Sequence, residues 1–173
     1  MQLVSRTERL VSAWDAFGNI REESTSTAGV DLTLKVKRTF RNDEDAWLIG
    51  LLETQQERSR ALSLEQCRTS SRTYGRHGRV RTESAGSDDG DPETVVRVRY
   101  TRDAFGNVIH TRAEDAFGGR RKACVSYDAE GVFPHAQRNP EGHVTYTRYD
   151  AGHGVLEAVV DPNGLATQWA HDG

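Results

Sequence analysis

The chain has 173 residues, enough for one domain or for one part of a larger domain. Hydrophobic residues make up 35% of it and charged residues 28%, which is apolar-poor for a globular protein, although its aromatic residues argue against plain disorder. The net charge of −3 gives no overall attraction to nucleic acid, and no apolar stretch is long enough to span a bilayer or to act as a secretory signal. This composition argues against a nucleic-acid-binding protein, a membrane-spanning protein and a conventionally secreted enzyme.

Residues 1–94 are expected to form a leading segment with irregular strands. Residues 32–40 alternate as a strand does, and residues 41–47 are typical of a polar turn. Residues 51–68 combine moderate helix propensity with local alternation. We predict mostly extended structure there, because pairing with neighbouring strands overrides local helix propensity. Residues 84–93, rich in Gly, Ser and Asp, are predicted to be a flexible loop.

A short period dominates residues 95–173. An Asp or Asn followed by Gly, usually three residues later, recurs with spacings of 12, 13, 11, 11 and 11 residues between successive acceptors. The pairs are Asp103 and Gly106, Asp115 and Gly118, Asp128 and Gly131, Asn139 and Gly142, Asp150 and Gly154, and Asp161 and Gly164. In the unit that begins at Asp150, the glycine comes one residue later, which indicates an insertion. An early copy stands at residues 15–18.

Each unit has the chemistry of a hairpin turn. Asp or Asn at the first position of a type I turn accepts a hydrogen bond from the backbone two residues on, and Gly adopts the left-handed conformation at the fourth position. A type I turn followed by such a glycine is a common hairpin connection. Units of 11 residues leave about seven residues, or about 23 Å, for each strand. We therefore expect Gly142 and Gly164 to have positive φ.

The segments between the turns have the pattern of strands. Residues 95–101 and 143–149 alternate β-branched or aromatic residues with polar ones, and residues 155–160 and 165–171 do so less clearly. Neither face of these strands is uniformly apolar. The sequence therefore predicts an all-β fold in which residues 95–173 form tandem antiparallel β-hairpins in a single-layer sheet, with stacked nearest-neighbour units rather than a closed core.

These units resemble the YD repeats of the Rhs family, which Rhs proteins share with the shell components of Tc toxins and with teneurins. The resemblance lies in residues 127–134 and 149–150, where Tyr precedes the turn Asp, and in residues 160–164 together with Trp169. Residues 40–50 also resemble the segment that precedes the repeats in toxin-shell members. The resemblance spans about residues 10–173 and is strongest from residue 95 onward. The early copies depart from the motif: Gly75 replaces Asp, and Asp103 and Asp115 lack the preceding Tyr.

The resemblance implies a function by enclosure. In such proteins the repeats form a curved, hollow β-shell around a toxin or another variable C-terminal polypeptide. The expected role is that of a non-catalytic shell segment, truncated at its C-terminus, in the extracellular space or at the cell surface as part of a larger protein. Its partners would be further YD repeats of the parent protein or the enclosed polypeptide. The alternative is a β-sheet module that binds carbohydrate or a cell-surface partner.

No catalytic, cofactor or metal site is expected. The regularly placed Asp residues are explained by their role in turns, which argues against paired catalytic carboxylates. Residues 87–91 have the composition of a calcium-binding loop but lack its ligand spacing. His135, His143 and His153 lack the short spacing of metal ligands, and an arginine-rich stretch at residues 68–81 is read as a solvated strand face. The two cysteines are more simply free thiols than a disulfide.

Four aromatic residues are the candidates for glycan contact. They are Tyr127, Tyr146, Tyr149 and Trp169. Exposed aromatic rings on a sheet could stack on sugar rings, but they could equally pair across strands and stabilise a sheet without a core. A binding module requires several of these rings on one exposed face, whereas a wall requires them to be spread over cross-strand pairs.

Overall fold

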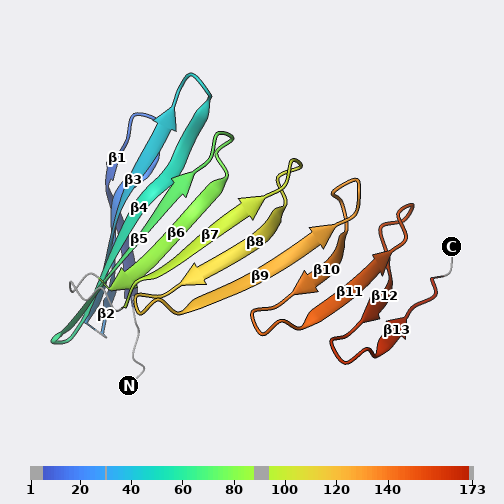
Figure 1. Cartoon of the computed structure of the whole chain (residues 1–173). Helices are drawn as coiled ribbons and strands as arrows, with labels where there is room; N and C mark the ends of the chain where they lie inside the picture. The colour runs from blue at the N-terminus through green and yellow to red at the C-terminus, as the bar shows by residue number, and fades with distance from the viewer. Residues whose placement is uncertain (1–5, 30, 88–93, 172–173) are drawn as a thin grey trace. The chain divides into compact units, whose positions relative to one another are not determined.

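The computed structural model describes residues 6–29, 31–87 and 94–171 of the chain. These residues form thirteen strands whose order in the sheet is their order in the sequence (Figure 1). The neighbouring strands whose register is described pair antiparallel, and the predicted all-β fold of tandem hairpins is confirmed. The chain divides into two compact units, Met1–Arg97 with Asp115–Gly118, and Val98–Glu114 with Gly119–Gly173.

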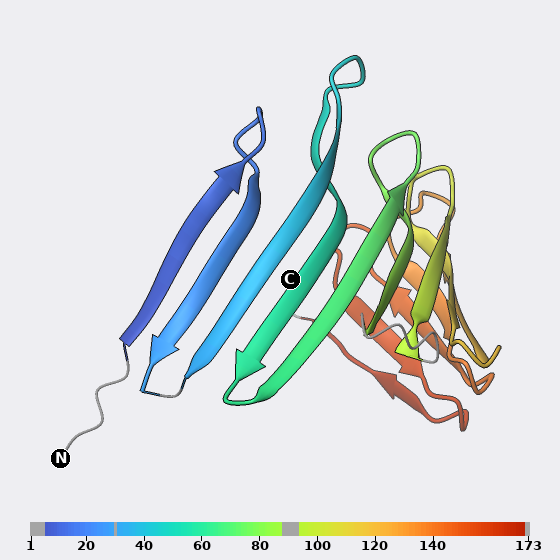
Figure 2. The same ribbon diagram turned by 90° about the vertical axis from the view of Figure 1, so that its left-hand side faces the viewer.

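The first unit contains six strands, of which the first five are the longest of the described chain. They are β1 (Arg6–Trp14), β2 (Ile20–Ala28), β3 (Leu32–Asp43), β4 (Leu48–Ala61), β5 (Leu64–Tyr74) and β6 (Val80–Ser87). Figure 2 shows β1 to β5 side by side in chain order. Register shifts occur in three strand pairs of this half, and the expected leading segment with irregular strands stays a prediction. Of the predicted loop, residues 84–87 belong to β6, and residues 88–93 lie outside the described residues.

Residues 51–68 are extended and lie in β4 and β5. Leu62, with φ of 55°, occupies the short turn between these two strands. Gln55 in the middle of β4 pairs with Arg38 on one side and with Ser70 on the other. Residues 54–61 pair with a strand on each side, which is why extended structure prevails over the local helix propensity there.

The second unit is built from shorter strands. Strand β7 (Val96–Arg102) begins in the first unit and ends in the second. The others are β8 (Val108–Glu114), β9 (Arg120–Tyr127), β10 (Pro134–Arg138), β11 (Val144–Tyr149), β12 (Leu156–Val160) and β13 (Ala166–Gln168). The predicted strand at residues 165–171 is thus reduced to three residues.

The sheet is a single layer without a hydrophobic core. Among the described residues, Val36 is the one buried apolar side chain, and no polar or charged residue is buried. Large apolar side chains such as Leu64, Phe117 and Trp47 are more than 70% exposed. Burial of apolar surface therefore contributes less here than in a globular domain. The sheet relies on its hydrogen-bond ladders and on cross-strand pairs of side chains.

The hairpins are of two kinds. We call a turn odd when it follows an odd-numbered strand and even when it follows an even-numbered strand. Register shifts occur in five strand pairs joined by odd turns, namely β1–β2, β3–β4, β5–β6, β9–β10 and β11–β12. The five described pairs joined by even turns keep a continuous register. Because a bulge bends and twists its strand, the two kinds of hairpin differ in local shape.

Candidate functional site

The six turns identified in the sequence all lie between strands. The glycine N–H of each turn donates to the carbonyl oxygen of its Asp or Asn, at 2.8–3.2 Å. The Oδ1 atom of each Asp or Asn also accepts from a backbone N–H two to four residues later. All six glycines have positive φ, with 89° at Gly142 and 83° at Gly164. The side chains of these Asp and Asn residues therefore form hydrogen bonds within their own turns.

The early turn at Asp15 has the same geometry and a strongly bound carboxylate. Asn19 donates to this carboxylate from its side chain at 2.9 Å and from its backbone at 2.8 Å, and Asn42 of β3 donates from its side chain at 3.2 Å. These bonds, with the side chain of Asn19 contributing most, lower the pKa of Asp15 to about 2. Asn42 also accepts from the N–H of Gly50 at 2.7 Å. One hydrogen-bond network thus connects the first odd turn to β4, the strand that follows the second odd turn.

The Asn that follows the glycine links one odd turn to the next. The sequence Asp-Ala-Phe-Gly-Asn occurs at residues 15–19 and 103–107, both in odd turns, whereas the even turn at residues 115–118 is followed by Gly119. Asn107 donates from Nδ2 to the carbonyl oxygen of Gly131 at 2.6 Å. Sequence reasoning missed this role, although the Asn was a visible signal for it.

Glycines near the odd turns are covered by side chains from the preceding odd hairpin. A Cβ atom at Gly50 would lie 3.0 Å from Oδ1 of Asn19, and one at Gly78 would lie 3.1 Å from Leu48. A Cβ atom at Gly131 would overlap the ring of Phe105, and one at Gly154 would touch the ring of Phe133. The even-turn glycines Gly118, Gly142 and Gly164 have no such neighbour within 4 Å among the described residues. We call the odd turns joined by these four contacts interlocked.

The candidate aromatic residues do not gather on one face. Tyr149 stacks on Phe133 with ring centroids 5.0 Å apart, and Tyr146 meets His135 edge-on at 6.4 Å. Tyr146 and Tyr149 are three residues apart on β11, so their side chains point to opposite faces of the sheet.

The other two aromatic candidates also lie apart. Tyr127 pairs in register with Pro134, and Trp169 lies beyond the end of β13 with 44% of its surface exposed. Two of the four candidate rings, Tyr146 and Tyr149, therefore form aromatic pairs. Tyr146, 51% exposed, and Trp169 are also accessible to solvent.

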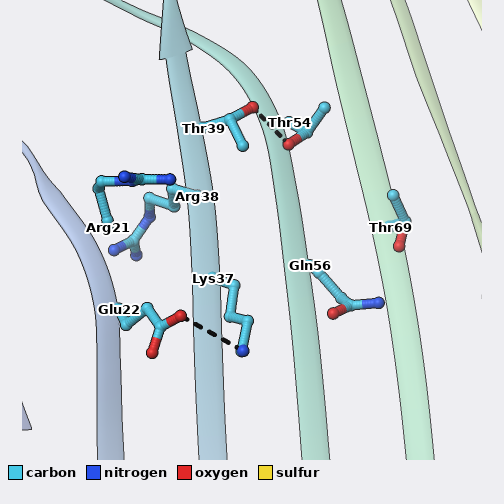
Figure 3. Close-up of a pocket in the computed structure, with 8 residues that line it drawn as sticks. All are labelled: Arg21, Glu22, Lys37, Arg38, Thr39, Thr54, Gln56 and Thr69. Carbon is cyan, nitrogen blue, oxygen red and sulfur yellow. Dashed lines mark hydrogen bonds and ion pairs between the residues drawn. The ribbon is translucent and has the colours of Figure 1, made fainter. Parts of the chain in front are cut away.

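A shallow polar hollow of about 430 Å³ lies over β2 to β5 (Figure 3). The register places Lys37 beside Glu22 and Gln56, and Gln56 beside Thr69. The Lys37 ammonium pairs with the Glu22 carboxylate at 3.3 Å, and the Thr39 and Thr54 hydroxyls bond each other at 2.6 Å. No local sequence motif predicts this hollow, because its lining residues come from four different strands.

The opposite face of the first unit carries a charge network beside Val36. Glu23, which pairs in register with Val36, accepts from Arg38 at 2.6 Å and from Nε of Arg9 at 2.6 Å. The Arg38 hydrogen bond, followed by that from Arg9, lowers the pKa of Glu23. Arg38 also donates to Gln55 at 2.9 Å, so that the network spans β1 to β4.

The other sites considered from sequence are not assembled in the described part of the chain. No group of three or more His, Cys, Asp or Glu side chains there could hold a metal ion. Cys67 and Cys124 are not joined by a disulfide, and Sγ of Cys124 lies 3.1 Å from Nδ1 of His110. The described residues include no helix that is long and apolar enough to cross a membrane. No model of a known protein family matches the chain, and no curated protein matches it.

Proposed function

We propose that the chain is a non-catalytic wall segment of an Rhs-type YD-repeat shell that encloses a toxin or another polypeptide. The observation that carries this proposal is the coreless single-layer sheet, in which Val36 is the one buried apolar side chain among the described residues. A layer of this kind presents both faces to its surroundings. That suits a wall with contents on one side and solvent on the other.

The interlocked odd turns support the same role. Each hairpin contacts its neighbours in the sequence, as Phe105 contacts Gly131 and Phe133 contacts Gly154. Structures built from nearest-neighbour contacts can be lengthened by adding repeats without redesigning a core. The partners of the proposed wall are further YD repeats of the parent protein and the enclosed polypeptide. It requires no cofactor, and we place it at the cell surface or outside the cell as part of a larger protein.

The test is limited proteolysis of the natural gene product that contains this chain. We expect the enclosed polypeptide to resist protease in the wild type and to become cleavable in Gly131→Val, which disrupts an interlocked odd turn. Gly142→Val is the matched control, because it has a similar φ and an open surrounding. Equal cleavage of the enclosed polypeptide in the wild type and in Gly131→Val would contradict the proposal.

Carbohydrate binding is the second candidate, favoured by the exposed rings of Tyr146 and Trp169. A glycan array probed with the whole chain tests it. A specific signal that falls in Trp169→Ala or Tyr146→Ala, but not in Phe117→Ala on the even turn after β8, would support binding. The absence of a specific signal would leave the wall as the sole role proposed here.

A further inference from the structure

The covering of glycines near the odd turns follows one direction along the chain. Asn19 covers Gly50, Leu48 covers Gly78, Phe105 covers Gly131, and Phe133 covers Gly154. In each case the covering side chain lies in, or next to, the preceding odd turn, two strands earlier. The β3–β4 and β9–β10 hairpins therefore each present a glycine to the preceding odd hairpin and a side chain to the following one.

Gly18 departs from this arrangement. It lies in the first odd turn and has φ of 84°, as the covered glycines have positive φ, yet a Cβ atom there would meet nothing within 4 Å among the described residues. Its own hairpin does deliver a side chain to the next one, through Asn19. The first odd hairpin thus covers a glycine of the next odd hairpin, whereas no described residue covers its own Gly18.

Strand β1 is open on the same side. It is the first strand in the sheet order and pairs with β2 alone among the described strands. Leu10 is 65% exposed and Trp14 is 57% exposed. The strand contains no Pro or Lys, although it carries Arg6, Glu8 and Arg9 and has register shifts near its C-terminal end. An edge of this kind offers a row of backbone N–H and C=O groups to another strand.

We propose that β1 and Gly18 together form a docking surface for a further β-hairpin of this same repeat type. The second strand of that hairpin pairs antiparallel with β1, and the side chain that follows its turn glycine covers Gly18. This inference rests on the proposed wall function and identifies the partner of one edge of the wall. Self-pairing of β1 from two copies of the chain would be antiparallel and would place the partner's turn at the opposite end of β1, away from Gly18.

The experiment uses the whole chain and an extended chain in which a copy of residues 6–31 replaces residues 1–5. Hydrogen exchange is followed by NMR at single amides of β1. We expect the amides of β1 that point away from β2 to exchange about tenfold more slowly, or slower still, in the extended chain. The amides that already pair with β2 are the internal control.

A second measurement separates turn docking from general stabilisation. In the original chain, Gly18→Ala and Gly142→Ala should lower the urea midpoint similarly, because both positions have positive φ and open surroundings. In the extended chain, Gly18→Ala should lower it further than Gly142→Ala. Changing Asn19→Ala in the added copy alone should remove that difference.

Unchanged exchange of the outward-pointing β1 amides in the extended chain would overturn the docking surface. So would sedimentation of the original chain as a dimer in which these amides are already protected, because the edge would then belong to a second copy. Neither result affects the enclosure proposal, which is decided by protease resistance of the enclosed polypeptide.

Discussion

The ring of Phe105 lies over Gly131, so closely that a side chain at position 131 would overlap it. These two residues belong to successive odd turns, and Asn107 of the first turn also donates to the carbonyl oxygen of Gly131 at 2.6 Å. Gly131 is therefore constrained twice, by its φ of 70° and by its neighbour.

Gly131→Ala should destabilise the chain more than Gly118→Ala. Both substitutions place a Cβ in the left-handed region, which costs about 1–2 kcal/mol, but only the former also forces the Phe105 ring to move, at about 1–3 kcal/mol more. Urea unfolding of the two variants measures the difference. The double variant Phe105→Ala with Gly131→Ala should lose part of the excess cost, and strictly additive effects would show that the two residues are not coupled.

Asn107→Ala should cost about 0.5–1.5 kcal/mol, because it removes the side-chain hydrogen bond that joins two odd turns. Asn163→Ala is the control, since that side chain bonds Asp161 within its own even turn, at 3.4 Å. Thermal or urea unfolding of both variants provides the comparison. Equal losses of stability would argue against a special role for the inter-turn bond.

The chain should lose stability in acid partly through Asp15. The pKa of this carboxyl is about 2 in the folded chain, below the ordinary value of 3.8, so it binds its proton more weakly when folded. Its contribution is therefore fully present above about pH 4 and is lost as the pH falls towards 2. Asp15→Asn should show a smaller loss of stability between these pH values. An NMR titration of Asp15 with a midpoint near pH 4 would contradict the prediction.

Glu23→Gln should destabilise the first unit by about 1–2 kcal/mol, because Arg9 and Arg38 lose their shared anion in a partly shielded position. Glu65→Gln should have little effect, since the Arg58–Glu65 pair has both side chains more than half exposed. Urea unfolding at low and high salt tests this pair of variants. A Glu65→Gln effect as large as that of Glu23→Gln would show that exposure does not decide the strength of these ion pairs.

The turns could be predicted from the sequence because each is a local structure that four or five residues specify. Asp161 and Gly164, for example, need no distant partner to form their turn. The long strands of the first unit could not be predicted in the same way. Gln55 is extended because it pairs with Arg38 and Ser70, which are distant in the sequence.

The candidate sites show the same limit. Lys37 and Thr69 line one hollow only because the register aligns the strands that carry them. The contacts between successive odd turns could be predicted from the sequence only in part. The Asn after the glycine at residues 19 and 107 was visible in the sequence, but its partner two strands away was not.

The even turns have a consequence for how the sequence can vary. Gly142 and Gly164 touch no neighbouring turn in the described part of the chain, so extra residues inserted beside them would disturb mainly their own hairpins. An insertion beside Gly131 would instead displace Phe105 and the turn that carries it. Length polymorphism, affinity tags and grafted recognition loops should therefore be tolerated better beside Gly142 and Gly164 than beside Gly131.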